Sequence, residues 1–152
     1  MKILILSDSH NSSLEEINLS KYDCIIHCGD YGQNYDYLEN NNIYYVCGNC
    51  DIKGPKYSIV EIFGKKVLIT HGDIENVKYG YDRLVYKSLE LGVDICFYGH
   101  THQPTFFKEE NILFVNPGSY PNNYVEINDY EIIFYKRELF KNKRLKTFEY
   151  KW

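Results

Sequence analysis

The sequence has little of what marks membrane-spanning, exported or nucleic-acid-binding proteins. None of its apolar runs approaches the roughly 20 residues of a membrane helix. The opening Lys-Ile-Leu-Ile-Leu-Ser run is too short for a signal peptide. Lysine and arginine (17) are fewer than aspartate and glutamate (21), which gives a net charge of −4, whereas a dedicated nucleic-acid binder needs a cationic surface. We therefore expect a cytoplasmic protein with neither a membrane span nor a nucleic-acid partner.

The chain also lacks internal repeats, low-complexity tracts and linkers. Its 152 residues, 44% of them hydrophobic, are the size of one domain, and we expect a single domain over residues 1–152. A chain of this length buries roughly two-thirds of its unfolded surface, so its core needs no disulfides. Without an export signal, the five cysteines are expected to be reduced thiols: Cys24, Cys28, Cys47, Cys50 and Cys96.

What the chain does contain is a series of short β-branched and aromatic runs separated by Gly, Asn, Asp and Ser. These runs predict strands at 2–7, 23–28, 43–47, 57–63, 66–70, 94–98, 104–108, 112–116, 123–127 and 130–136. Hairpin turns are expected at 63–66 and 127–130. Helices are expected at 12–20, where Ser12 or Ser13 begins a capping box, at 33–41, and at 80–91, where Gly92 ends the helix.

The order of these elements predicts an α/β fold. Strands and helices alternate in the first half, which favours a largely parallel sheet, whereas the second half consists of closely spaced strands. Two sheets packed face to face with helices outside accommodate both halves. The lysine-rich segment 136–146 fits either a solvated edge strand and tail or a phosphate-binding patch, and edge strands commonly carry lysines.

Metal-ligand side chains follow five of the predicted strands, usually beside a glycine. Because ligands bind at the carboxyl ends of strands in open α/β sheets, we expect these side chains to converge. Taken singly, a carboxylate could be a helix or turn cap, Asn49 a turn residue and His71 a structural histidine. Because such side chains follow five separate strands in one chain, a binding site is favoured instead. The segments are Asp8-Ser9-His10, Gly29-Asp30, Gly48-Asn49-Cys50-Asp51, His71-Gly72-Asp73 and Gly99-His100-Thr101-His102.

The donor types indicate metal chemistry. Imidazoles, carboxylates and one amide suit divalent Mn, Fe, Co, Ni or Zn. Seven such groups exceed what one ion accommodates, so two ions sharing a carboxylate are expected. A rival interpretation is a four-cysteine zinc ribbon built from Cys24, Cys28, Cys47 and Cys50. Against it, the residues between Cys24 and Cys28 have the pattern of a strand, whereas paired zinc thiolates need a turn. A Cys-x-x-Cys redox motif is weaker still, because no helix is predicted to begin at Cys47.

These motifs, in this order and followed by Asn116-Pro117-Gly118-Ser119, resemble the calcineurin-like metallophosphoesterases, and the Gly-Asn-Cys-Asp form is similar to their small YfcE-like phosphodiesterase branch. The resemblance covers residues 3–119 and implies a four-layer α/β/β/α sandwich with a dinuclear centre. The resemblance further implies that one ion is held by Asp8, His10, Asp30 and His102. The other is held by Asp30, Asn49, His71 and His100, with Asp30 bridging.

The resemblance also implies the activity: hydrolysis of a small phosphoester, first of all a diester, by a hydroxide that two metal ions activate. Manganese is the first expectation, with nickel, zinc, iron or cobalt as alternatives, and an oligomer is allowed. Asp30, Asn49 and His71 are the predicted catalytic residues. His27 is expected to pack or to hydrogen-bond behind the ligands, and Asp51 to orient a neighbouring ligand.

Several positions depart from the family pattern. Cys50 stands where many members carry a histidine thought to protonate the leaving group, and a thiol is poorly suited to that transfer. Asp73 replaces a second histidine, Cys47 replaces an arginine, and no arginine closely follows Ser119. These changes remove phosphate contacts. The alternative function is therefore a catalytically weak scaffold for protein interaction, as in the phosphoesterase-like subunit of retromer.

Overall fold

Two mixed β-sheets form the body of the protein. The structure, a computed structural model, describes residues 1–139 and 141–152. The strands are β1 (Lys2–Leu6), β2 (Cys24–His27), β3 (Tyr44–Tyr45), β4 (Tyr57–Ile62), β5 (Lys65–Thr70), β6 (Ile95–Phe97), β7 (Thr105–Glu109), β8 (Ile112–Asn116), β9 (Asn123–Asn128), β10 (Glu131–Glu138) and β11 (Lys141–Glu149). The helices are α1 (Tyr35–Asn40) and α2 (Asp82–Leu91), with 3-10 turns at Leu19–Lys21 and Gly32–Asn34. Across the described part of the chain, none of the helices is both long and apolar enough for a membrane crossing.

Each sheet contains three neighbouring parallel strands. The first sheet runs β11-β10-β9-β1-β2-β3, with β1, β2 and β3 parallel and β9, β10 and β11 antiparallel. The second runs β4-β5-β6-β8-β7, with β5, β6 and β8 parallel. Parallel neighbours end at the same edge of a sheet. The segments after β1, β2 and β3 therefore lie together, as do those after β5 and β6.

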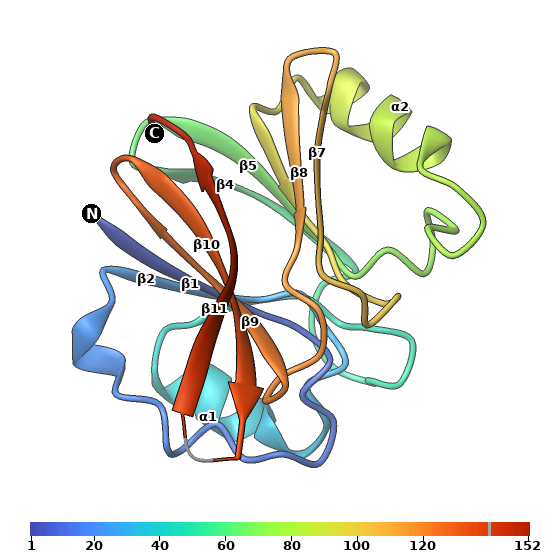
Figure 1. Ribbon diagram of the computed structural model, residues 1–152. Coiled ribbons are helices and arrows are strands. Elements are labelled where there is room, and N and C mark those ends of the chain that lie inside the picture. The colour runs from blue at the N-terminus through green and yellow to red at the C-terminus, as the bar shows by residue number, and fades with distance from the viewer. Residues whose placement is uncertain (140) are drawn as a thin grey trace.

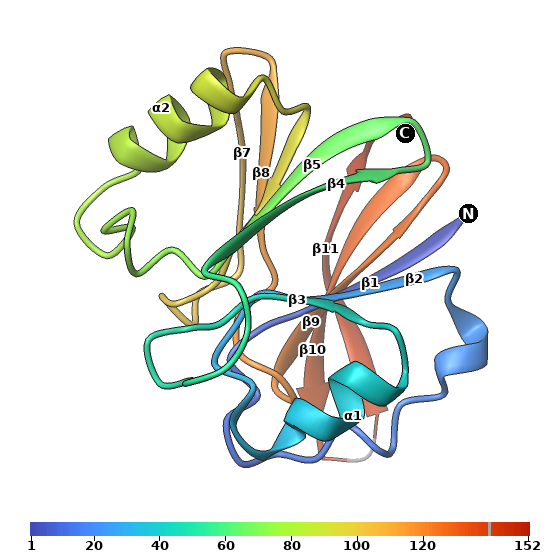
Figure 2. The ribbon, with the colours of Figure 1, turned by 180° about the vertical axis from the view of Figure 1, so that it is seen from behind.

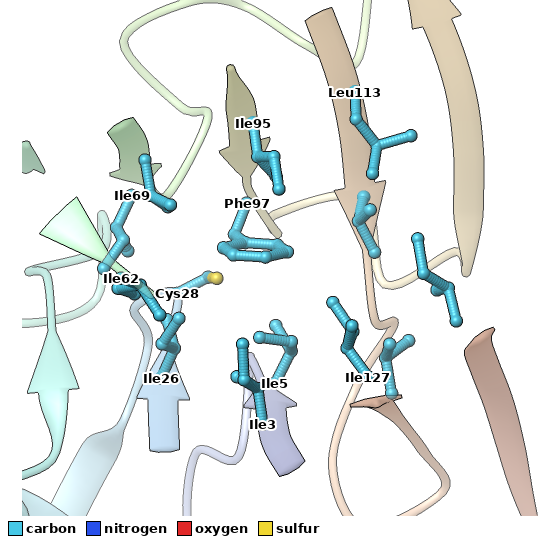
Figure 3. Close-up of a cluster of buried hydrophobic side chains, with 14 of the residues drawn as sticks. Ile3, Ile5, Ile26, Cys28, Ile62, Ile69, Ile95, Phe97, Leu113 and Ile127 are labelled. Atoms are coloured by element: carbon cyan, nitrogen blue, oxygen red, sulfur yellow. The ribbon is translucent and has the colours of Figure 1, made fainter. Parts of the chain in front are cut away.

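The main hydrophobic core lies between the two sheets (Figure 3). Side chains from alternate positions of β1 and β2, such as Ile3, Ile5 and Ile26, face Ile69, Ile95 and Phe97 of the opposite sheet. All six are fully buried. Alternation places every second side chain of a strand on one face, so each sheet has a second apolar face to cover.

Helices cover the outer faces, and this makes four layers. Leu38 of α1 packs with Leu4, Leu6 and Ile25 on the outside of the first sheet. Leu84 of α2 packs with Leu68, Cys96, Tyr98 and Phe114 on the outside of the second sheet. Figures 1 and 2 show α1 below the first sheet and α2 outside the second. The predicted α/β/β/α sandwich is confirmed.

Most predicted elements are present within a few residues of their expected bounds. The hairpins at 63–66 and 127–130 connect β4 to β5 and β9 to β10. Helix α2 ends where Gly92 adopts a left-handed φ of 62°, which a residue without a Cβ adopts easily. Within the lysine-rich segment, residues 141–146 lie in the edge strand β11 and residues 136–138 end its neighbour β10, so the edge-strand interpretation holds for these residues.

The predicted helix at 12–20 is wrong. This segment forms turns and a short 3-10 turn instead. The buried Asn34 side chain takes the place of helical hydrogen bonds, because its amide donates to Ser12 O (2.9 Å) and accepts from Leu14 N (3.2 Å). Leu14 is then fully buried against the first sheet. The Ser13 hydroxyl accepts from Glu15 N in a local turn rather than in a helix cap.

Candidate metal centre

The carboxyl ends of the parallel strands in both sheets lie close together. Beyond β1 and β2, backbone bonds from Asp8 N to Gly29 O and from His10 N to Asp30 O continue their pairing. Beyond β5 and β6, Gly99 N donates to His71 O (2.9 Å) in the same way. In Figure 2, the loops that follow β3 and β5 and the turn before β7 lie on the same side of the molecule. The site is therefore assembled by strand pairing from segments far apart in sequence.

One group of predicted ligands comprises Asp8, His10 and His102. Their donor atoms all lie within 4.8 Å of one another. His10 Nε2 is 3.4 Å from His102 Nε2, and His102 Nε2 is 3.1 Å from Asp8 Oδ1. Asp30 Oδ2 lies 4.0 Å from His10 Nε2, at the edge of this group.

A second group surrounds His71. Its Nε2 is 3.0 Å from Asn49 Oδ1, 3.2 Å from Asp30 Oδ2 and 3.8 Å from Asp8 Oδ1. Asp30 therefore lies between His10 and His71, where a carboxylate shared by two ions would have to lie. The ring of His100 is 5.0 Å from that of His71. However, His100 belongs to none of the tight groups of imidazole, thiol and carboxylate donors in residues 1–139 and 141–152.

The backbone at the predicted ligands is unusual. Asp8, His10, Asp30, His100 and His102 all have φ between 46° and 71°. This left-handed conformation is uncommon for residues other than glycine and costs energy that the surroundings must offset. Among the described residues, several of the other non-glycine cases lie in hairpin turns, as Phe63 does, whereas these five follow central strands. Strain concentrated at one place is typical of functional sites.

Two glycines leave room for the carboxylates. A Cβ on Gly48 would overlap Asp30 Oδ1, and a Cβ on Gly99 would overlap the Ser7 hydroxyl and come within 2.7 Å of Asp8 Oδ2. Neither glycine has a positive φ, so the requirement is close approach rather than conformational freedom.

Hydrogen bonds behind the predicted ligands fix their orientation. His71 Nδ1 donates to Cys28 O (2.8 Å), so Nε2 is the ring nitrogen that faces Asp30 and Asn49. Asp8 Oδ2 accepts from the Ser7 hydroxyl (2.6 Å) and from His100 N (3.1 Å). Both His71 and Asp8 thus connect the ends of the two sheets.

Asp51 connects the loops that carry Asp30 and Asn49. Its carboxylate accepts from Gly48 N (2.8 Å), Gly32 N (3.2 Å) and Tyr31 N (3.3 Å). These backbone groups flank Asn49 on one side and Asp30 on the other. The sequence-based expectation that Asp51 orients a neighbouring ligand agrees with these contacts.

Three supporting residues have roles that the sequence did not indicate. The buried Asn116 amide donates to Gly99 O and Thr101 Oγ1 (both 3.0 Å) and thereby holds the loop of His100 and His102. Ser119 donates to Asp8 O (2.9 Å). Ser9 Oγ lies 2.8 Å from His27 Nε2. The Asn-Pro-Gly-Ser motif was the only available signal for Asn116 and Ser119, and it carries no role by itself.

The charges at the site are strongly coupled. Burial raises the pKa of Asp30, but the neighbouring His71 ring and the Cys50 N–H outweigh burial and hold that pKa below its usual range. Burial lowers the pKa of His71, but Asp30 and Asp8 reverse the effect and raise it. The Asp30 carboxylate is thus held as an anion.

One buried oxygen atom indicates whether a cation would fit at this site. Asp8 Oδ1 has no solvent exposure and, in the described part of the chain, no hydrogen bond. His102 Nε2 is 3.1 Å away, but its orientation does not suit a hydrogen bond. A buried carboxylate oxygen without a partner is costly, and a cation among Asp8, Asp30 and the imidazoles would satisfy it. The donor set, of oxygen and imidazole nitrogen, fits a divalent ion.

Comparison with known proteins identifies the family. The sequence profile of the calcineurin-like phosphoesterase superfamily domain matches residues 1–133. The chain belongs to this superfamily. It is 30% identical over 145 residues to a phosphodiesterase of Methanocaldococcus jannaschii, with 78% of this chain and 83% of the relative covered.

Solved structures with this phosphoesterase fold cover nearly the whole chain. A predicted phosphoesterase from Streptococcus pneumoniae TIGR4 is 28% identical, with a TM-score of 0.76, and 98% of this chain and 97% of that one are covered. A zinc-complexed Vps29 from Entamoeba histolytica is 22% identical, with a TM-score of 0.78 and 98% and 99% covered. At that identity the likeness concerns the fold alone.

The structure places one lysine beside the centre of this phosphoesterase domain: Lys56 Nζ lies 3.4 Å from Gly48 O, next to Asn49. Burial, His71 and the charge of Lys78 together lower the pKa of His100. The rival zinc ribbon is not formed, because Cys50 is the only cysteine that the described residues bring into a group of three donors.

Proposed function

We propose that this chain is a metal-dependent phosphodiesterase that hydrolyses a P–O bond of a small phosphodiester. The single observation that supports it best is the position of Asp30. Its Oδ2 lies 3.2 Å from His71 Nε2 on one side and 4.0 Å from His10 Nε2 on the other, with the unpartnered Asp8 Oδ1 alongside. One carboxylate between two sets of nitrogen and oxygen donors is the arrangement that a dinuclear centre requires.

Seven residues would hold two divalent ions. In this proposal Asp8, His10, Asp30 and His102 hold the first ion, and Asp30, Asn49, His71 and His100 hold the second. Manganese comes first on these oxygen and imidazole donors, ahead of nickel, zinc, iron and cobalt. Such ions, when bound, polarise phosphoryl oxygens and make water nucleophilic at neutral pH.

The chain's own residues orient this chemistry. His71 presents Nε2 because its Nδ1 proton is held by Cys28 O. Asn49 contributes a neutral amide oxygen 3.0 Å from that nitrogen, which adds a donor without adding negative charge next to an anionic substrate. Asp30 is held by the N–H of Cys50 (2.9 Å) and remains ionised. Asp30, Asn49 and His71 are therefore the proposed catalytic residues.

A diester is favoured over a monoester for two reasons. The relative from Methanocaldococcus jannaschii carries the name phosphodiesterase. A monoester dianion also needs more positive charge around its phosphoryl oxygens, and Lys56, whose Nζ lies 3.4 Å from Gly48 O, is a single cation beside Asn49. Cys50 is a poor proton donor, so substrates with good leaving groups should react fastest.

A protein-interaction scaffold remains the second candidate. Two loops beside the centre each carry an exposed apolar side chain, Ile52 (98% exposed) and Tyr79 (89% exposed), as binding surfaces often do. The Vps29 proteins share this fold, and one has been solved in complex with a cyclic peptide. Catalytic turnover separates the two candidates.

The decisive experiment combines turnover with metal content. We expect the manganese-loaded protein to hydrolyse bis(p-nitrophenyl) phosphate faster than p-nitrophenyl phosphate, with two ions bound per chain. Asp30→Ala and Asn49→Ala should reduce turnover to the background rate while circular dichroism stays unchanged. Asn122→Ala, at an exposed position, serves as the matched control. Full activity in both site variants would contradict the proposal, and folded protein without turnover would favour the scaffold.

A further inference from the structure

Cys50 is the one exposed thiol among the five cysteines, and it lies at the metal centre. Its Sγ, a ring nitrogen of His10 and a carboxylate oxygen of Asp30 all lie within 4.8 Å of one another. The other four cysteines are buried or half-buried and belong to no such group within residues 1–139 and 141–152.

Neighbouring hydrogen bonds hold Cys50 in this position. Its backbone N–H donates to Asp30 Oδ1 (2.9 Å), which ties the residue to the proposed bridging carboxylate. The Asn49 amide has its oxygen 3.0 Å from His71 Nε2 and its nitrogen 3.5 Å from Cys50 Sγ. Asn49 can therefore serve one ion through Oδ1 while its N–H groups face the sulfur. An N–H donor beside a sulfur ligand is a typical outer-shell contact of metal thiolates.

Cys47, in the same loop segment, has a different environment. Cys47 is buried, and its thiol donates to Asp51 O at 3.2 Å. Its sulfur therefore faces the loop backbone. Of the two cysteines in this segment, only Cys50 is placed to reach an ion.

We propose that Cys50 is a thiolate ligand of the ion held by His10 and Asp30, and that this position therefore prefers zinc or cobalt to manganese. The inference rests on the proposed dinuclear centre and refines it. Zinc and cobalt bind nitrogen and sulfur donors well, whereas manganese prefers oxygen donors. On binding, the thiol loses its proton to solvent and forms one metal–sulfur bond, with no change of oxidation state.

Cobalt reports directly on a sulfur ligand. Full-length protein stripped with chelator is titrated with CoCl₂, and the near-ultraviolet thiolate-to-cobalt charge-transfer band is recorded together with the number of ions bound. The same titration is done with Cys50→Ser, Cys50→Ala and the matched control Cys24→Ser. We expect the band in the wild type and in Cys24→Ser and its loss in both Cys50 variants. Circular dichroism checks that each variant is folded.

Competition titrations test the metal preference. Cys50→Ser should lower zinc affinity at least about tenfold and change manganese affinity much less. Bound zinc should also slow carbamidomethylation of Cys50 by iodoacetamide, followed by peptide mass spectrometry.

Three results would overturn the inference: two cobalt ions bound without the band, a band that persists in folded Cys50 variants, or equal losses of zinc and manganese affinity. In each of these the dinuclear centre itself would stand. If the wild type took up no cobalt, zinc or manganese, the proposed function would fail and this inference with it.

Discussion

Asn116 offers a sharp test of how the scaffold positions the candidate centre. It is fully buried at the end of β8 and is not a predicted ligand. Its side chain donates to Gly99 O and Thr101 Oγ1 and accepts from Gly118 N (2.9 Å). Asn116→Ala removes all three contacts. The buried Gly118 N–H is left without a partner, whereas Gly99 O keeps only the bond from Thr101 N (2.9 Å).

The expected magnitude follows from these contacts. Each buried polar group left unsatisfied costs about 1–3 kcal/mol, and water entering the vacated space reduces the cost. With one such group, the Gly118 N–H, we expect the free energy of unfolding of the metal-free protein to fall by about 1–3 kcal/mol. Proteins of this size are commonly stable by about 5–15 kcal/mol, so the variant should still fold. Because Gly99 begins the loop of His100 and His102, metal affinity should fall about 10–100-fold.

Two measurements separate stability from metal binding. Urea unfolding in chelator gives the first, and calorimetric titration with Mn²⁺ below the unfolding transition gives the second. Asn122→Ala, on the exposed side of the same chain segment, should change neither. Wild-type metal affinity in a destabilised Asn116→Ala protein would refute the positioning role. An Asn116→Ala protein as stable as the wild type would refute the expected cost of the lost hydrogen bonds.

Two further predictions concern the surroundings of the proposed ligands. Burial and the nearby His71 lower the pKa of the His27 imidazole to about 3, so below pH 6.5 the unfolded chain binds a proton that the folded chain does not. The free energy of unfolding should therefore fall by about 1.4 kcal/mol per pH unit from pH 6.5 towards 3. Urea unfolding at pH 6.5, 5.5 and 4.5 measures this dependence, and the free energy of unfolding of His27→Gln should depend less steeply on pH. An unchanged slope would assign the loss to other groups. Gly48→Ala should displace the Asp30 carboxylate, since the added methyl overlaps Oδ1, and should abolish uptake of two ions in a metal assay; normal uptake would contradict this packing.

The fold was largely predictable from periodicity and turn residues. Runs of β-branched and other apolar residues located β1 and β2, and Gly92 marked the end of α2. The prediction of a helix at 12–20 was wrong because the residue that determines the conformation of this segment lies elsewhere in the chain. Asn34, about 20 residues later, supplies the hydrogen bonds that hold Ser12 and Leu14 in an irregular loop. A local capping signal carries no information about such a competitor.

The predicted site was accessible to sequence reasoning because strand ends are punctuated by glycine and followed by donor side chains. The structure brings Asp8, His10, Asp30, Asn49, His71 and His102 together and leaves His100 beside them. Some of the residues behind them were not predictable. Asn116 and Ser119 act through backbone groups of distant loops, and such contacts leave no periodic pattern.

The backbone of the predicted ligands indicates how the centre is maintained. Left-handed residues other than glycine persist only when their surroundings over-determine them, at about 1–3 kcal/mol each where the conformation is strained. At Asp30 the surroundings include Asp51, which holds the adjacent Tyr31 and Gly32 N–H groups, and at His100 they include the bond from its N–H to Asp8. Asp8 and Asp30 thus act twice, as proposed ligands and as acceptors that fix the loops of other ligands. Because each loop is held by a residue from another, displacement of one should loosen the rest, and the donors should lose ions together rather than one at a time.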